Sequence, residues 1–333
     1  MPLLEVENLQ TVFTTDQGLV QAVRDVSFTV DQGEALGIVG ESGSGKSQTM
    51  YSIIGLLADN GIVKAESIKF DGQDITPSHF ASKKEYEAAM GKLRGNSMAM
   101  IFQDPMTFLN PILKIGTQLV EPIMNHNNVS MSEARQRAIH LMEQVGIPSP
   151  EKRIDQYPFE FSGGMRQRIV IAIALANSPK LIIADEPTTA LDVTIQAQVL
   201  ELIDELKKNS NSAIIMISHD LGVVAKLCDK IAIMYGGKLV EFGTDRDIFY
   251  DPKHPYTRGL LNCVSNPEDD EDKPLQPIAG SPPDLLNPPK GCPFVDRCGD
   301  ALRICKDRLP ETTVFSDTHR CACWLHYNKE ASK

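Results

Sequence analysis

Apolar and polar residues alternate along two stretches near the start of the chain, residues 3–13 and 20–30. A period of two residues is typical of antiparallel strands that bury one face. Asp16-Gln17-Gly18 lies between the two stretches and predicts a turn. The chain is therefore expected to open with a β ribbon, and residues 66–76 predict a further alternating strand that ends in an Asp-Gly turn. The apolar positions of the ribbon are Leu4, Val6, Leu9, Val23, Val26, Phe28 and Val30.

Short continuous apolar runs predict strands that are buried on both faces, and longer periodic segments between them predict helices. Ser130 and Glu133 form a capping box at the start of one such helix. Strands that alternate with helices indicate an α/β fold. The expected buried strands are 35–39, 98–103, 181–184 and 213–218, the expected helices are 48–57, about 82–94, 130–145 and about 193–208, and residues 105–165 are expected to be mainly helical.

A glycine-rich loop lies between the strand expected at 35–39 and the helix that follows it. It matches G-x-x-x-x-G-K-[ST], the phosphate-binding P-loop. Glycines let backbone N–H groups turn toward phosphates, and the helix N-terminus adds its positive dipole end. Lys46 is expected to bridge the β- and γ-phosphates and the Ser47 hydroxyl to bind Mg²⁺. The candidate ATP-binding residues here are Gly40, Glu41, Ser42, Gly43, Ser44, Gly45, Lys46, Ser47 and Gln48.

Carboxylates and other polar side chains stand at the ends of the remaining buried strands. Asp185 and Glu186 follow an apolar strand in the Walker B form, where Asp185 holds Mg²⁺ and Glu186 accepts a proton from the attacking water. Gln103 ends another strand, from which it could reach the metal or the water, and His219 ends a third. Ser162-Gly163-Gly164 opens a helix and can also present N–H groups to an anion.

Composition limits the classes of function. The 333 residues, 42% of them apolar, predict about two domains with ordinary cores. A net charge of −11 argues against nucleic acid as the main partner. No apolar run approaches the roughly 20 residues that span a bilayer, and the N-terminus lacks a secretory signal, so we expect a cytosolic chain. Seven cysteines, five of them after position 290, then suggest metal binding rather than disulfides.

The P-loop, the Walker B strand and the intervening Ser162–Gln167 loop, in this order and spacing, resemble the ATP-binding-cassette (ABC) ATPase family from about residue 4 to 250. The resemblance implies a RecA-like core with an antiparallel β subdomain and a helical subdomain at about 104–165. It makes Gln103 the Q-loop glutamine, Asp192 part of the D-loop and His219 the switch histidine. Met165 replaces the usual glutamine of the signature loop, but the phosphate contacts would fall on Ser162 and Gly164. Phe13 is a candidate for stacking on the base, with a core role as the alternative.

The C-terminal third resembles the C-terminal extension of oligopeptide and dipeptide importer ATPases. Residues 188–198 resemble the same subfamily. The shared features are His254–Leu261 (HPYTRGLL) and a cysteine block. Domains are therefore expected at 1–250 and 251–333. The resemblance implies a 4Fe-4S cluster. Zinc is one alternative, and free thiols that pack a small domain without metal are the other. The expected ligands are Cys292, Cys298, Cys305 and Cys323, with Cys321 as a substitute for the last.

The same resemblance implies the function and the partners. The expected function is ATP hydrolysis that powers peptide uptake by a bacterial importer, at the cytoplasmic face of the membrane. The match looks closest to the D-type subunit, so the expected partners are a non-identical F-type ATPase, two transmembrane permeases and an extracytoplasmic peptide-binding protein, with no nucleic acid. Two ATPase chains are needed because each ATP lies between one chain's P-loop and the other's signature loop. The alternatives are the ATPase of a nickel or metal-chelate importer and a soluble, non-transport cassette ATPase.

Overall fold

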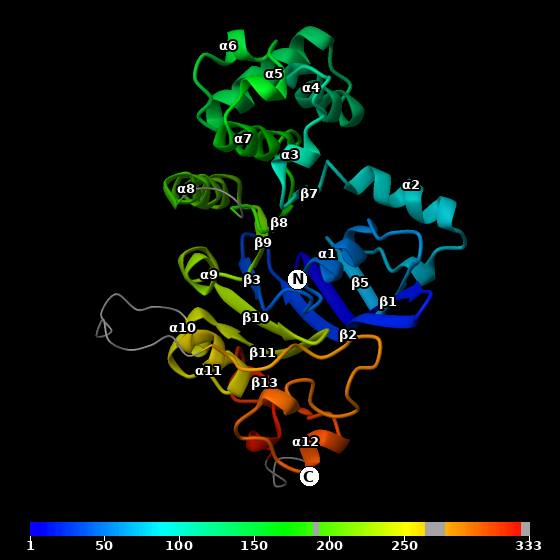
Figure 1. Cartoon of the computed structure of the whole chain (residues 1–333). Coiled ribbons are helices and arrows are strands. Elements are labelled where there is room, and N and C mark those ends of the chain that lie inside the picture. Colours follow the sequence, from blue (N-terminus) through cyan, green and yellow to red (C-terminus); the bar gives the residue numbers. More distant parts are fainter. Residues whose placement is uncertain (189–192, 264–276, 328–333) are drawn as a thin grey trace. The chain divides into compact units, whose positions relative to one another are not determined.

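The computed structural model describes residues 1–188, 193–263 and 277–327, and these form two compact units (Figure 1). Unit 1 comprises Met1–Val30, Leu36–Phe80 and Ile217–Lys333. Unit 2 comprises Asp31–Ala35 and Ala81–Met216. No helix in these described ranges is long and apolar enough to cross a membrane.

An antiparallel sheet forms the first half of unit 1. Strands β1 (Leu4–Thr15) and β2 (Gly18–Val30) make the expected ribbon, with Leu4 opposite Val30. Strand β1 also pairs with β4 (Gly61–Lys64) and β5 (Ser67–Phe70), and β5 continues to β6 (Gln73–Asp74). The apolar positions of the ribbon are buried, as the alternation predicts. Helix η1 (Pro77–His79) follows β6.

A second sheet in unit 1 carries the loop expected to bind phosphate. Its strand order is β12 (Thr312–Val314), β13 (Arg320–Ala322), β11 (Lys238–Thr244), β10 (Lys230–Tyr235) and β3 (Ala35–Val39). Strands β10 and β3 are parallel, whereas β10–β11 and β11–β13 are antiparallel. The helices of this part are α1 (Lys46–Ile54), α9 (Leu221–Leu227), α10 (Asp245–Tyr250), α11 (Pro255–Asn262), η3 (Val295–Arg297), α12 (Ile304–Asp307) and η4 (Trp324–His326).

Unit 2 combines three strands with half of the helices that the structure describes. The strand order is β9 (Ala213–Ser218), β8 (Leu181–Asp185) and β7 (Met98–Ile101), and β7 is parallel to β8. All residues of β8 and β9 are buried, which explains their continuous apolar runs. The helices are α2 (Lys83–Leu93), α3 (Pro105–Phe108), α4 (Ile115–His126), α5 (Met131–Gln144), α6 (Pro150–Arg153), η2 (Pro158–Glu160), α7 (Gly163–Ala174) and α8 (Val193–Ser210).

The main elements agree with the sequence, with three differences. Residues 66–76 are a short hairpin rather than one strand, because Asp71 and Gly72 both take positive φ and reverse the chain. Helix α1 begins two residues before the expected position and ends at Gly55, which takes the left-handed conformation of a helix C-cap. The C-terminal region adds β12 and β13 to the sheet of unit 1, a pairing that the sequence analysis did not predict.

Candidate active site

The loop from Gly40 to Ser47 connects β3 to α1, as the motif requires. A side chain on Gly40 would place its Cβ 2.2 Å from the Met234 carbonyl oxygen, and one on Gly45 would lie 2.3 Å from the Ala22 oxygen. Gly43 and Gly45 also have positive φ, of 78° and 99°. Gly40 therefore lacks the space for a side chain, Gly43 has a backbone conformation that favours glycine, and Gly45 meets both restrictions.

The start of α1 is open to an anion. No side chain caps this helix, and no acidic residue lies in its first turn. The Lys46 ammonium donates to the carbonyl oxygens of Gly40 and Glu41, at 2.7 and 3.0 Å, so it lies across the loop. The Ser44 hydroxyl is buried without a hydrogen-bond partner among the described residues. The loop thus combines a cation, a helix N-terminus and a buried hydroxyl, the chemistry that binds phosphate.

Glu41, the second residue of the loop, is held by the C-terminal region. The Tyr256 hydroxyl accepts a hydrogen bond of 2.9 Å from the backbone N–H of Glu41. The Arg297 guanidinium binds its carboxylate through two hydrogen bonds, of 2.6 and 3.0 Å. These hydrogen bonds to Glu41 raise the pKa of Arg297, although burial opposes the shift. The sequence analysis missed both contacts, because 215 and 256 residues separate the partners and no local pattern reports such a distance.

In unit 2 the structure brings together two residues predicted to be catalytic. The Gln103 amide donates a hydrogen bond of 3.1 Å to the Glu186 carboxylate. The parallel pairing of β7 and β8 causes this, because Ile101 lies opposite Ala184 and both strands end at the same edge. Glu186 has a φ of 46°, a left-handed conformation that is costly for a residue with a side chain. Asp185, at the end of β8, is 1% exposed.

The loop at Ser162 opens helix α7 as predicted. The Ser162 hydroxyl caps the helix by accepting from the Met165 N–H at 3.4 Å. A Cβ on Gly164 would lie 2.7 Å from the Ile195 side chain, so this glycine permits close packing against α8. Buried Gln167 donates to the Pro187 carbonyl at 2.7 Å, which ties the start of α7 to the segment after Glu186.

The other predicted ATP-site residues remain predictions. Phe13 is half-buried in β1 opposite Gly61, a position that fits a packing role as well as an accessible ring. His219 is exposed at the end of β9. Asp192 lies outside the described residues. Gly163 and Gln48 lie at the starts of α7 and α1.

The four cysteines expected to bind a cluster lie near one another. Cys292, Cys305 and Cys323 are buried, and the Cys292 N–H donates to the Cys305 carbonyl at 2.8 Å. Burial raises the pKa of Cys292 to about 12, and the charges of Cys305, Cys323 and Cys298 add to this effect. Among the described residues, however, no three His, Cys, Asp or Glu side chains are arranged to hold a metal ion.

Cys321 and Cys323 differ in their surroundings. Burial raises the pKa of both thiols. After burial, the next contribution at Cys321 is the charge of Glu241, whereas Cys323 interacts with Cys298 and Cys305. Cys321 lies in β13 opposite Glu241. Cys321 also interacts with Cys292 and Cys323, so the choice of Cys323 as the fourth member of the group stays a prediction.

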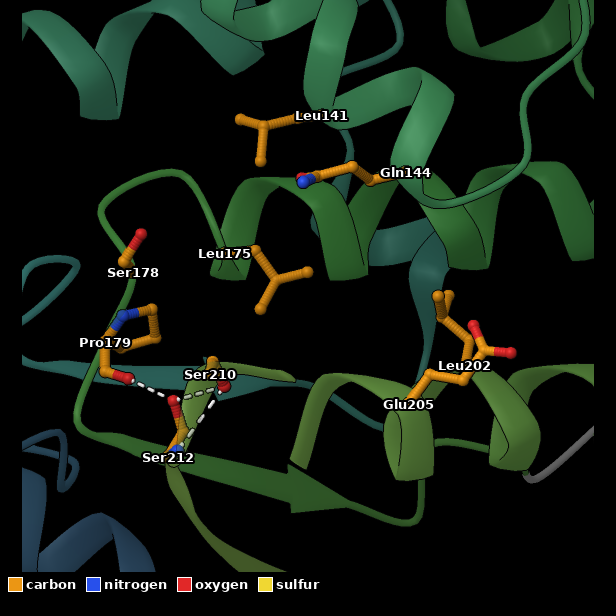
Figure 2. A pocket seen from close by; sticks show the side chains of 9 residues that line it. All are labelled: Leu141, Gln144, Leu175, Ser178, Pro179, Leu202, Glu205, Ser210 and Ser212. Carbon is orange, nitrogen blue, oxygen red and sulfur yellow. Dashed lines mark hydrogen bonds between the residues drawn. The ribbon is translucent and has the colours of Figure 1, made fainter. Parts of the chain in front are cut away.

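A cavity of about 290 Å³ lies in unit 2 among α5, α7, α8 and the segments before β8 and β9 (Figure 2). None of the predicted site residues lines it. Its serines bond within the protein, since the Ser212 hydroxyl donates to the Pro179 carbonyl at 2.6 Å and the Ser210 hydroxyl donates to Ser212 at 2.8 Å. These two serines are thus bound within the protein.

Comparison with known proteins supplies the family. A profile of the ABC transporter family matches residues 23–189, half of the chain. This chain belongs to the ABC transporter family. It is an ABC ATPase, which binds and hydrolyses ATP with Mg²⁺. A second profile, for the C-terminal region of oligopeptide/dipeptide transporters, matches residues 240–305.

Several relatives of this ABC ATPase share almost its whole length. It is 52% identical to the oligopeptide transport ATP-binding protein OppD of Bacillus subtilis, over 97% of this chain and 88% of the relative. It is 51% identical to the dipeptide transport ATP-binding protein DppD of the same organism, over 97% and 94%. It is also 51% identical to OppD of Escherichia coli, over 97% and 93%.

Solved structures agree on the fold. The dimeric, post-hydrolysis ATP-binding cassette MJ0796 bound to ADP and Pi matches with a TM-score of 0.63 and 24% identity, over 73% of this chain and 99% of that one. CbiO1 of Clostridium perfringens, part of the ABC transporter complex cbiONQ, matches with a TM-score of 0.62 and 26% identity, over 75% and 91%. The expected ABC ATPase fold is thus confirmed.

Proposed function

We propose that this ABC ATPase drives a bacterial importer of oligopeptides or dipeptides from the cytoplasmic face of the membrane. The observation that carries the proposal is the match over 97% of the chain to proteins named for oligopeptide and dipeptide transport. These relatives favour peptides over a nickel or metal-chelate substrate and over a non-transport role. The likeness includes the C-terminal region as well as the cassette.

The proposed catalytic roles follow the chemistry of the side chains. The P-loop and Gln48 bind the triphosphate, and Phe13 stacks on the base. Ser47, Asp185 and Gln103 hold Mg²⁺, while Glu186 is the base that accepts a proton from the attacking water. The hydrogen bond between Gln103 and Glu186 supports their joint action on that water. His219 contacts the γ-phosphate from the end of β9. Ser162, Gly163, Gly164 and Asp192 act on the ATP of the partner chain.

The proposed assembly contains a second, F-type ATPase, two permeases and an extracytoplasmic peptide-binding protein. A second chain is needed because this one carries a single P-loop and a single signature loop. Residues 1–250 would form the cassette, with a helical subdomain at about 104–165, and residues 251–333 the extension.

We further propose that Cys292, Cys298, Cys305 and Cys323 bind a 4Fe-4S cluster, with zinc as the alternative. The support is the donor set: four thiols, three of them buried, whose charges act on one another. Thiolates are the ligands that such clusters use. Metal analysis of protein prepared without oxygen and chelators tests this. About four irons per chain would support the cluster. One zinc and no iron would indicate a zinc site instead, and the absence of both metals would indicate free thiols.

The proposed function is tested by isolating the complex through a tag on this chain. We expect two permeases and a second ATPase to co-purify. In liposomes, the complex should take up a labelled oligopeptide or dipeptide in the presence of its binding protein and ATP. Uptake of a nickel chelate without peptide uptake would contradict the proposed substrate, and co-purification without any permease would contradict transport.

A further inference from the structure

All hydrogen-bond donors of the Arg297 side chain bind acceptors within the protein. Its five N–H groups make five hydrogen bonds, and its side chain is only 6% exposed. The acceptors are the two carboxylate oxygens of Glu41, the Tyr235 hydroxyl and the carbonyls of Ile278 and Ala279. The guanidinium also lies over the rings of Tyr235 and Phe294, at 5.7 and 6.0 Å from their centroids. Because all five N–H groups are bonded, the guanidinium is held in one orientation, unlike that of a loose surface ion pair.

All polar groups of Glu41 are held in turn. Its N–H bonds to Tyr256, its carbonyl accepts from Lys46 and Ser44, and its carboxylate binds Arg297. Two residues from the C-terminal region thus fix the first turn of a loop that lies more than 200 positions away in sequence. The loop's geometry therefore depends on the docking of that region.

The charge of Glu41 needs compensation when ATP binds. ATP is a polyanion, and the carboxylate belongs to the same short loop as the phosphate-binding N–H groups. Charges closer than the roughly 8 Å screening length of physiological salt act on one another. The bidentate arginine neutralises the carboxylate and fixes its direction.

We propose that Arg297 is a positioning residue of the ATP site, which holds and neutralises Glu41 and so sets the affinity for nucleotide. The C-terminal extension then contributes to ATP binding, although its residues are not part of the P-loop. This inference rests on the proposed role of residues 40–47 in nucleotide binding. It is independent of the transported solute and of any metal at the cysteines.

Arg320 offers a matched control. It is also an arginine of the C-terminal region, and it helps to dock that region to the rest of unit 1. Its guanidinium donates to the Ser27 carbonyl at 2.9 Å and lies 4.6 Å from the Phe242 ring centroid. No described contact joins Arg320 to the P-loop. Loss of Arg320 therefore loosens the docking without removing the charge that faces Glu41.

The experiment measures the Kd of ATP·Mg²⁺ for the purified full-length chain by calorimetry. Arg297→Gln should raise the Kd about tenfold, equivalent to about 1.4 kcal/mol. Arg297→Lys should give a smaller rise, because it keeps the charge but not the fork. Arg320→Gln should leave the Kd within about twofold. In the assembled complex, Arg297→Gln should raise KM for ATP while kcat stays near the wild-type value.

A double-mutant cycle separates charge compensation from general loosening. In a Glu41→Gln background no carboxylate remains to be neutralised, so adding Arg297→Gln should change the Kd by less than about twofold. An unchanged Kd in Arg297→Gln alone would overturn the inference. So would an equal rise in Arg320→Gln, or a full tenfold rise in the Glu41→Gln background. Wild-type affinity in Lys46→Ala would instead overturn the role of the P-loop in the proposed function.

Discussion

At the scale of single residues, Glu186 carries the chemistry of the proposed mechanism. Glu186→Gln keeps a side chain that can bond to Gln103 but removes the base. With the partner subunit similarly disabled, hydrolysis by the assembled complex should fall by roughly 10²-fold or more, because general-base catalysis supplies a factor of about that size. Phosphate release measures the rate, and calorimetry should show that ATP binding survives.

The exposed Glu201→Gln serves as the control for this substitution, because it makes the same chemical change on the surface of α8. Its rate should equal that of the wild type. Normal turnover in Glu186→Gln, with the partner subunit similarly disabled, would contradict the assigned role.

His254 gives the fold a measurable pH dependence. Burial lowers its pKa to about 3, and its Nδ1 accepts from the Tyr256 N–H at 3.1 Å. In the unfolded chain the His254 ring takes up a proton near pH 6.5, whereas in the folded chain it stays neutral at that pH. Stability therefore falls as the pH drops below 6.5. Between pH 7 and 5, the wild type should lose about 2 kcal/mol more stability than His254→Asn, which keeps a helix-capping acceptor.

Chemical denaturation at several pH values measures this loss. His140→Asn, at an exposed site, should retain the full pH dependence of the wild type. Equal slopes in the wild type and His254→Asn would show that His254 is protonated in the folded state.

At the scale of elements, Glu241 joins β11 to α11 and to the C-terminal strands. This carboxylate is 0% exposed and accepts from the Lys253 and His254 N–H groups, the Thr257 hydroxyl and the His319 ring. Glu241→Ala should lower the free energy of unfolding by about 3–5 kcal/mol, because it leaves several buried donors without an acceptor. Urea denaturation measures this, with exposed Glu311→Ala as the control. A loss below about 1 kcal/mol would mean that this network contributes little.

The C-terminal elements also link the cysteines to the ATP site. Arg297 lies in η3, between Cys292 and Cys298. If these thiols bind a cluster, Cys305→Ser should lower the iron content and also weaken ATP binding through Arg297. Exposed Cys263→Ser should change neither. Loss of iron with an unchanged Kd for ATP would show that the cluster does not affect nucleotide binding by the P-loop.

The sequence predicts local elements well and distant contacts poorly. The P-loop and the Walker B strand follow from short motifs, but the hydrogen bond between Gln103 and Glu186 became visible only in the structure, where β7 and β8 end at one edge. The segment 66–76 was predicted as one strand, whereas it forms a hairpin whose second strand, β6, has only two residues and no apolar position to indicate it. The contacts of Tyr256 and Arg297 with Glu41 depend on tertiary packing, so no sequence period reports them.

At the scale of the whole molecule, the single set of motifs predicts dependence on a partner. The purified chain should bind ATP but hydrolyse it slowly, because its signature loop faces no P-loop of the proper partner. Addition of the second ATPase and the permeases should restore turnover. Full activity of a monomer at every protein concentration would contradict the shared site.

The central claim is that ATP hydrolysis by this chain powers peptide import. The most direct test is the ATPase rate of the complete complex in liposomes, with the binding protein either empty or loaded with peptide. We expect the peptide-loaded binding protein to stimulate hydrolysis several-fold, and Glu186→Gln, with the partner ATPase similarly disabled, to abolish the stimulation. A rate that does not respond to any oligopeptide or dipeptide, but rises with a nickel chelate, would contradict the account.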